Sequence, residues 1–171
     1  MESEELLEII DLKGNIIGSE LRKNIHGNPS LMHRVVHVLV TNRKGEILLQ
    51  KRSQKKDVAP GRWDTSVGGH VGKGEELLTS SKREMHEELG ISGHEPEYLY
   101  SYIHSNDYET EMVTTFRCTC EHGFSFNAEE IDDIRFWSHD EIKNAIGLQI
   151  LSDNFEHEFR TYLEYVNYNS L

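Results

Sequence analysis

Residues 69–91 read GHVGKGEELLTSSKREMHEELGI and carry the clearest helix signal in the chain. Most of residues 75–89 are strong helix formers. Gly90 follows them at the position where a left-handed glycine commonly ends a helix. We therefore predict a helix over residues 75–89, entered from a glycine-rich loop.

Three glutamates fall on one side of the predicted helix. At about 100° per residue, Glu84, Glu87 and Glu88 lie within a wedge of about 100°. The apolar residues expected to face the core form a stripe beside this wedge, made of Leu78, Met85 and Leu89. Like charges at this spacing destabilise a helix slightly, so the acidic cluster requires an explanation.

A divalent cation is one explanation of the acidic cluster. Mg²⁺ and Mn²⁺ bind through carboxylate oxygens, keep some of their waters, and bridge to substrate phosphates. Arg83 neighbours Glu87 on the helix and can hold a carboxylate in a fixed orientation through a bidentate contact. The alternative is an ordinary solvated acidic face, because one side of a surface helix normally faces water.

Composition limits the other possibilities. The chain has 171 residues and a net charge of -12, from 30 acidic and 18 basic residues. One domain spanning residues 1–171 is expected at this length. An acidic chain is a poor binder of nucleic-acid polymers, because neutralising their phosphates needs clustered Lys and Arg. No apolar run is long enough to cross a bilayer, and the acidic start MESEELLEII resembles no targeting peptide, so we expect a cytoplasmic protein without membrane contact.

The remaining pattern predicts strands and helices around a mixed sheet. Two apolar runs flank a Lys-Gly-Asn turn and predict an N-terminal hairpin within residues 1–25. Residues 34–41 are rich in β-branched side chains and predict a buried strand. Residues 152–167 carry apolar side chains at helical spacing and predict a C-terminal amphipathic helix. Further strands are predicted at residues 97–104, 108–120 and 134–137. The fold class is therefore α/β or a related mixed class.

The segment 69–91 resembles the Nudix box. Its spacing is a glycine, a glutamate after five residues, an Arg-Glu pair after seven more, and then a Glu-Glu pair, with a glycine and apolar residues where the box has them. On this motif the chain is similar to Nudix proteins over residues 5–150. The resemblance implies the Nudix fold, a mixed β-sheet in an α/β/α sandwich.

The resemblance also implies site residues and a chemistry. Nudix proteins mostly hydrolyse a nucleoside diphosphate linked to another moiety. Glu84, Glu87 and Glu88 match the carboxylates that bind metal or supply the base. Arg83 matches an orienting arginine, and the backbone carbonyl of Gly69 matches a metal ligand. Diphosphate hydrolysis needs neutralised phosphate oxygens and a positioned, deprotonated water, and Mg²⁺ or Mn²⁺ can supply both.

A second resemblance extends outside the box, to type I isopentenyl diphosphate isomerase, a Nudix relative that does not hydrolyse its substrate. Five metal-binding positions of that enzyme correspond to His26, His33, His70, Glu109 and Glu111. The two glutamates share one face of a predicted strand, and an acidic residue after the box often completes the metal shell in hydrolases. Structural histidines and a solvated strand edge are the alternatives.

The catalytic cysteine of the isomerase is replaced. Gly68 stands at that position and has no proton to give or take. Loss of one of two proton-transfer groups disfavours isomerisation, whereas the complete carboxylate box favours hydrolysis. An isomerase-like reaction remains an alternative, together with a non-catalytic Nudix binding module.

Three residues ahead of the box are candidates for substrate contact, namely Arg52, Lys56 and Trp63. The two cations can bind phosphate or belong to an ordinary solvated loop. Trp63 can stack on a base or pack into the core. We predict a divalent-metal-dependent hydrolase of a diphosphate linkage, in a nucleoside diphosphate derivative or a related organic pyrophosphate. The family resemblance makes a homodimer a further expectation.

Overall fold

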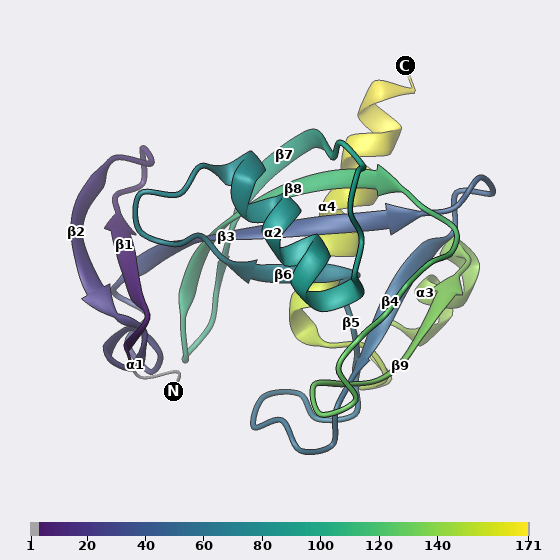
Figure 1. The fold of residues 1–171 in the computed structure, drawn as a ribbon, viewed down its shortest axis with the longest axis horizontal. Coiled ribbons are helices and arrows are strands. Elements are labelled where there is room, and N and C mark those ends of the chain that lie inside the picture. The colour runs from purple at the N-terminus through teal and green to yellow at the C-terminus, as the bar shows by residue number, and fades with distance from the viewer. Residues whose placement is uncertain (1–3, 171) are drawn as a thin grey trace.

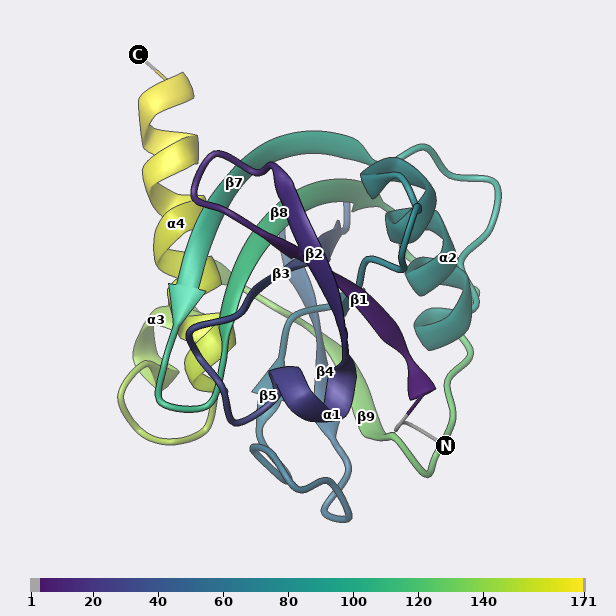
Figure 2. The ribbon, with the colours of Figure 1, turned by 90° about the vertical axis from the view of Figure 1, so that its left-hand side faces the viewer.

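The computed structural model describes residues 4–170, which form a mixed β-sheet between helices (Figure 1). The strands within these residues are β1 (Leu6–Ile10), β2 (Ile16–Leu21), β3 (Met32–Thr41), β4 (Ile47–Arg52), β5 (Trp63–Asp64), β6 (Val67–His70), β7 (Glu97–Ser105), β8 (Thr110–Thr119) and β9 (Ile131–Trp137). The helices are α1 (Arg22–Ile25), α2 (Leu77–Leu89), α3 (His139–Ala145) and α4 (Asp153–Asn169). Figure 2 shows α2 and α4 on opposite sides of the strands, which is the predicted α/β/α sandwich.

Strand β3 lies in the middle of the sheet. It pairs in parallel with β8 along its whole length and antiparallel with β6 over part of it. Its ends also meet β1 and β4. The run VVHVLV suits this position, because Val36, Val38 and Val40 pack on the α2 side while Leu39 packs on the α4 side. The predicted strand over residues 34–41 is therefore confirmed and begins two residues earlier.

Two apolar clusters join the three layers. Met85 and Leu89 of α2 pack on one face of the sheet. Ile142 of α3 and Phe155 and Phe159 of α4 pack on the other face. Burial of these side chains fixes which face each helix presents to the sheet.

Helix α2 matches the predicted helix, with a difference at its start. It begins at Leu77, after Glu76 in an extended conformation. It ends at Gly90, which is left-handed with φ 67° as the glycine signal predicted. A residue with a side chain is strained in that conformation, so this glycine sets the end of the helix.

The predicted apolar stripe of α2 is partly wrong. Met85 and Leu89 are buried as expected, but Leu78 is 41% exposed. Leu77 packs against the core beneath the first turn in its place.

The predicted N-terminal hairpin is present. Strands β1 and β2 pair antiparallel, and Gly14 is left-handed in the turn with φ 82°. Residues 1–3 of the predicted hairpin segment lie outside the described residues. Helix α1 follows β2 and was not predicted, because a single turn is too short to show helical periodicity.

Strands β5 and β6 lie in a segment for which the sequence predicted neither strand nor helix. β6 pairs with β3 from Val67 opposite Val38 to His70 opposite Val35. Its two glycines at positions 68 and 69 have little strand propensity, so the pairing depends on tertiary contacts. Within residues 4–170, β6 pairs with no other strand and therefore lies at an edge.

The C-terminal helix α4 agrees with the predicted segment 152–167 to within two residues at its end. Ser152 caps it, since its hydroxyl accepts a hydrogen bond from the Phe155 N–H at 3.0 Å. Phe155, Phe159 and Tyr162 are buried along one side. No helix among residues 4–170 is long and apolar enough to span a bilayer.

Replacing Phe155 by alanine tests the docking of α4. Phe155 is 0% exposed, so Phe155→Ala should lower the free energy of unfolding by about 3–5 kcal/mol. Tyr168 on the same helix is 79% exposed. Tyr168→Ala should therefore change the free energy of unfolding by no more than about 0.5 kcal/mol. Urea denaturation followed by circular dichroism measures both, and equal effects would contradict the packing described.

Candidate metal centre and active site

Glu84 of α2 lies directly against strand β6. A Cβ at Gly69 would overlap the Glu84 carboxylate, so the glycine leaves room for this carboxylate where it lies. The Glu84 carboxylate is largely buried, and burial raises its pKa above the ordinary value. The backbone of Gly69 and the Glu84 carboxylate are therefore neighbours, as a shared metal site requires.

The guanidinium of Arg83 links the acidic side chains of α2. Nη1 donates to Glu84 Oε1 at 2.7 Å and to Glu87 Oε2 at 3.1 Å. Nε donates to Glu75 Oε2 at 3.0 Å, and Nη2 donates to the His70 carbonyl at 3.0 Å. The bond from Arg83 lowers the pKa of Glu75, and the bond to Glu75 raises the pKa of Arg83. This geometry fits an orienting role for Arg83.

Glu88 points away from Arg83. Its Oε2 accepts a hydrogen bond from the Gly68 N–H at 2.9 Å. Burial raises the pKa of Glu88 to about 8, against the opposing effect of that hydrogen bond. The carboxyl group is therefore largely protonated near pH 7 in this arrangement.

The three box glutamates do not meet at one point. Glu84 and Glu87 are joined through Arg83, whereas Glu88 turns to Gly68. Among residues 4–170, the groups of three potential ligands with atoms within 4.8 Å of one another include none of these glutamates. An ion shared by all three requires side-chain rotation on α2.

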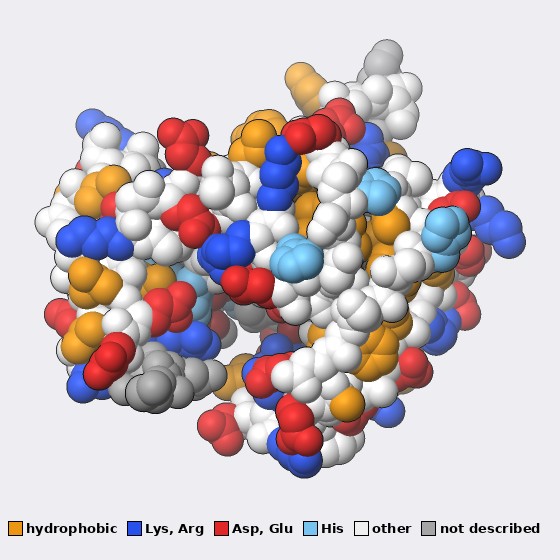
Figure 3. Space-filling view, in the orientation of Figure 1, with side chains coloured by type: hydrophobic (Ala, Val, Ile, Leu, Met, Phe, Trp, Pro, Cys, Tyr) orange, Lys and Arg blue, Asp and Glu red, His pale blue; other side chains and the backbone are white. Residues whose placement is uncertain are grey.

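A cavity of about 180 Å³ lies beside these glutamates. Its lining residues are Gln50, Arg52, Lys56, Glu87, Glu88, Asn127, Glu130 and Ile131. Figure 3 shows a hollow on the face of the molecule that carries α2, with acidic and basic side chains around it. A larger cavity of about 410 Å³, lined in part by His94 and Cys120, contains none of the predicted site residues.

The structure places two of the predicted substrate-contact residues in the smaller cavity. Arg52 and Lys56 line it together with Glu87 and Glu88, whereas Glu84 is not among the lining residues. Both cations have acidic partners, because Lys56 pairs with Glu130 and Arg52 Nη1 lies 3.5 Å from an Asp64 oxygen. Exposed pairs of this kind are weak, so a phosphate can displace them.

Trp63 is not among the lining residues of that cavity. Its ring meets Trp137 edge-on, with 5.3 Å between the ring centroids. It packs against the apolar cluster on the α4 side of the sheet. Of the two roles left open by the sequence, this geometry matches core packing.

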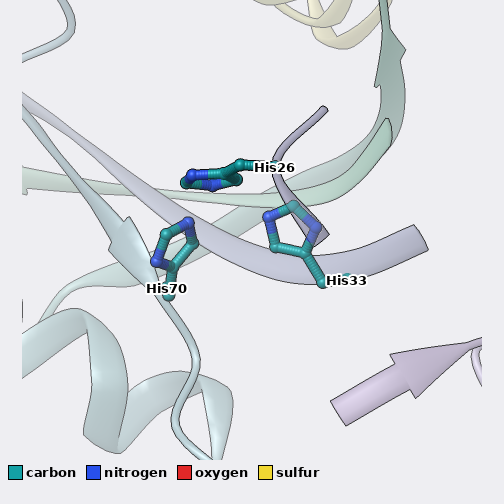
Figure 4. A group of neighbouring side chains, drawn as sticks. All are labelled: His26, His33 and His70. Carbon is teal, nitrogen blue, oxygen red and sulfur yellow. The ribbon is translucent and has the colours of Figure 1, made fainter. Parts of the chain in front are cut away.

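A second group of potential ligands lies at the end of β6. His26 follows α1, His33 lies at the start of β3, and His70 ends β6 (Figure 4). The ring nitrogens of the three histidines lie within 4.8 Å of one another, and so do ligand atoms of His33, Glu109 and Glu111. We call these five residues the histidine centre. Segments far apart in the sequence thus bring together the residues that the isomerase resemblance identified.

Three buried nitrogen atoms of the histidine centre form no hydrogen bond of ordinary geometry. His26 Nε2 and both ring nitrogens of His33 are buried and form no hydrogen bond within residues 4–170. The nearest carboxylate oxygens lie 3.4 Å from His26 Nε2, on Glu109, and 3.6 Å from His33 Nε2, on Glu111. An unsatisfied buried polar atom destabilises a fold, and most native structures avoid it. Ligation of a cation would satisfy these atoms, so the donor set fits a metal site.

The protonation states of His26 and Glu111 also suit metal binding. Burial and the nearby His70 lower the pKa of His26 to about 4, so its ring is neutral near pH 7. Burial and the charge of Glu111 raise the pKa of Glu109 to about 7. Burial alone would raise the pKa of Glu111, but its contact with His33 outweighs this and lowers it. Neutral imidazole and ionised carboxylate are the forms that bind metals.

Sequence reasoning missed several residues around the site. Glu75 holds Arg83, and its fixed position in the box was the signal that could have identified it. Glu5 lies 3.5 Å from His70, whose hydrogen bond lowers the pKa of Glu5 to about 2. Glu130 lines the cavity. The last two belong to no motif, and only the tertiary fold brings them to the site.

Comparison with known proteins defines the class of this one. The family model described as NUDIX domain matches residues 31–159, and the chain belongs to the Nudix family. It is 32% identical over 138 residues to an uncharacterized Nudix hydrolase of Yersinia pestis, covering 81% of this chain and 75% of that protein. It is 30% identical over 141 residues to the uncharacterized Nudix hydrolase YfcD of Escherichia coli (strain K12), covering 82% and 77%. The protein is therefore a Nudix hydrolase.

Solved structures share the fold. DR0079 from Deinococcus radiodurans matches with a TM-score of 0.79 and 21% identity, over 92% of this chain and 98% of that one. The NUDIX domain of Shewanella oneidensis NrtR, solved with ADP ribose, matches with a TM-score of 0.58 and 15% identity, over 78% and 87%. At these identities the likeness supports the fold alone. None of the four proteins is named as an isomerase.

The raised pKa of Glu88 predicts a pH-dependent stability in the presence of a chelator. The folded protein keeps the Glu88 proton up to about pH 8, whereas an unfolded chain loses it near its ordinary value of 4.5. The free energy of unfolding should therefore fall as pH rises from about 5 to 8. Glu88→Gln should reduce this fall and should be more stable than the wild type at pH 8.

Urea denaturation with EDTA at several pH values measures this difference. Glu164 is exposed on α4, and Glu164→Gln should follow the wild-type pH dependence. Equal pH dependence in Glu88→Gln and the wild type would show that Glu88 is not protonated in the folded protein.

Proposed function

We propose that this Nudix hydrolase cleaves a diphosphate linkage in a nucleoside diphosphate derivative or a related organic pyrophosphate, with Mg²⁺ or Mn²⁺ as cofactor. The observation that carries the proposal is the cavity that places Arg52 and Lys56 with Glu87 and Glu88. Hydrolysis of a diphosphate needs basic side chains that bind the phosphates and carboxylates that bind a metal ion. Both groups must lie in one place.

Each residue has a chemical role in this proposal. Arg52 and Lys56 bind phosphate oxygens, and Arg83 orients the carboxylates. Glu84, Glu87, Glu88 and the Gly69 carbonyl hold the divalent ions, and Glu87 or Glu88 takes the proton of the attacking water. The bound cations supply charge neutralisation and a more acidic water. The products are a monophosphate and a phosphorylated remainder.

The histidine centre provides a second ion-binding position in this proposal. His26, His33 and His70 with Glu109 and Glu111 offer nitrogen and oxygen donors together. Such a mixed donor set suits Mn²⁺ or another transition metal better than Mg²⁺, which prefers oxygen alone. The ligand atoms of this centre lie within 4.8 Å of one another in two groups of three, whereas the box glutamates form no such group within residues 4–170.

The charge and composition of the enzyme support proposals about its ligands and its cellular compartment. A net charge of -12 favours small-molecule diphosphates that arrive with their own cations over nucleic-acid polymers. Two free cysteines suit a cytoplasmic protein. A homodimer is proposed from the family resemblance only, and Gly68 disfavours the isomerase-like alternative because it carries no acid or base.

A substrate screen tests the proposed reaction. The panel contains nucleoside di- and triphosphates, nucleotide sugars including ADP ribose, dinucleoside polyphosphates, coenzyme A and prenyl diphosphates, each with Mg²⁺ or Mn²⁺. Glu87→Gln or Glu88→Gln should lower kcat by at least about 100-fold on the best substrate, the usual effect of losing a proton acceptor. The exposed Glu164→Gln is the matched control and should keep wild-type kcat.

Two results would contradict the hydrolase proposal. Absence of turnover over the whole panel, with metal-independent ligand binding, would favour a binding module. Deuterium exchange into isopentenyl diphosphate in D₂O would favour the isomerase-like reaction.

Mn²⁺ binding tests the histidine centre separately from turnover. His26→Gln and His70→Gln should each lower the number of Mn²⁺ ions bound per chain. Each substitution removes one of the five potential ligands of the histidine centre and so weakens its affinity for Mn²⁺. His122 is exposed and lies outside the centre, so His122→Gln should bind as the wild type does. Electron paramagnetic resonance of free Mn²⁺ gives the count, and unchanged binding in both test variants would contradict a metal site.

A further inference from the structure

A buried carboxylate of the N-terminal hairpin reaches the loop that enters helix α2. We call this loop, residues 71–76, the box loop. Glu8 of β1 is 8% exposed. Its Oε1 accepts a hydrogen bond from the Gly74 N–H at 2.9 Å, and its Oε2 accepts one from Nη2 of Arg34 in β3. Figure 1 shows β1 beside the box loop. One side chain therefore ties the box loop to the hairpin and to the central strand.

Glu8 and Arg34 together hold the box loop at two points. At its start, the Val71 N–H donates to the Arg34 carbonyl at 3.1 Å. Near its end, Glu8 binds Gly74, where the backbone is left-handed with φ 75°. Glu75 is the next residue, so its position depends on where Glu8 holds Gly74.

Glu75 passes this constraint on to the acidic side of α2. Its Oε2 accepts a hydrogen bond from Arg83 Nε at 3.0 Å, and its Oε1 accepts one from Nη2 at 3.0 Å. The same guanidinium donates to Glu84 and Glu87. A continuous series of contacts thus runs from Glu8 to two of the carboxylates that we propose as metal ligands.

The hairpin does not need the Glu8–Arg34 pair to dock on the sheet. Leu7 and Ile9 of β1 pack with Ile25 of α1 in a buried apolar cluster, and β1 also pairs with β3. Burying a charged pair is costly, and apolar side chains would attach the hairpin at least as well. Arg34 Nε is buried and forms no hydrogen bond within residues 4–170, which adds to this cost. The pair therefore points to a use beyond packing.

We infer that Glu8 is a positioning residue for the proposed hydrolysis, which holds Gly74 and thereby keeps Glu75 and Arg83 where Arg83 orients the box glutamates. The inference rests on the proposed function for its effect on catalysis. The family model matches residues 31–159, so Glu8 lies outside the matched region. In this chain the hairpin is thus part of the framework of the active site.

Glu8→Gln tests the inference in the full-length protein. Glutamine has a single acceptor oxygen, so Gly74 and Arg34 compete for it. On the best substrate of the panel, kcat should fall about tenfold, because a small displacement of an orienting group slows the reaction. KM should stay within about twofold, because Arg52 and Lys56 still bind the phosphates.

A double variant and a matched control accompany this test. Glu8→Gln with Arg34→Gln should recover most of the lost kcat. With glutamine at both positions, the amide at position 8 can donate to position 34 and keep its own oxygen for Gly74. Glu4 is exposed and lies just ahead of β1, so Glu4→Gln should keep wild-type kcat. A double variant no faster than Glu8→Gln alone would contradict the inference.

NMR of the Arg83 side chain gives a readout that needs no turnover. Arg83 Nε–H donates to Glu75 and not to Glu8, so it responds to Glu8→Gln only if the box loop transmits the change. Exchange of this proton with solvent should become at least about tenfold faster in Glu8→Gln and should stay at the wild-type rate in Glu4→Gln.

The wild-type protein provides a measurement that does not depend on the folding of a variant. Its Gly74 amide should exchange with D₂O at least about tenfold more slowly than in an unfolded chain, because Glu8 accepts its hydrogen bond. An unprotected Gly74 amide, or a wild-type kcat or Arg83 exchange rate in Glu8→Gln, would overturn the inference and leave the hydrolase proposal standing. The expected Arg83 response in a chain that hydrolyses nothing in the substrate panel would keep the positioning by Glu8 and refute the proposed hydrolase.

Discussion

The close approach of helix α2 to strand β6 is the constraint on which the site depends. Gly69 has no side chain, and the Glu84 carboxylate occupies the space where a Cβ would lie. The adjacent Gly68 lets the His37 ring pack close to the strand, because a Cβ there would lie 3.1 Å from His37 Cδ2. Because neighbouring residues of a strand point to opposite faces, two consecutive glycines let side chains reach the strand from both sides.

The two groups of ligands differ in how far the fold organises them. The histidine centre takes its side chains from β3, β6, β8 and the segments beside them, and their ligand atoms form two groups of three within 4.8 Å. The box glutamates all come from one helix, and Arg83 holds two of them. A cation that competes with Arg83 can rearrange these glutamates, whereas the histidine centre needs little movement.

Groups that destabilise the fold gather around β6. Glu88 carries a raised pKa, the buried ring nitrogens of His33 form no hydrogen bond of ordinary geometry, and Glu158 is a fully buried carboxylate. The apolar clusters on the two faces of the sheet must offset these costs, since they contain the helices that carry Glu88 and Glu158. A concentration of strained or costly groups in one place is typical of a functional site.

The sequence by itself determined the helix of the box, its glycine stop, the central strand and the amphipathic C-terminal helix, because each depends on local propensity or periodicity. It also supplied the family through the box, and the isomerase resemblance identified five potential ligands that the fold brings together. Only the tertiary structure decided that Leu78 is exposed, that β6 forms at two glycines, and that Glu84 and Glu87 bind Arg83 while Glu88 turns away. These outcomes depend on which distant backbone approaches each side chain, and periodicity along one segment carries no information about that.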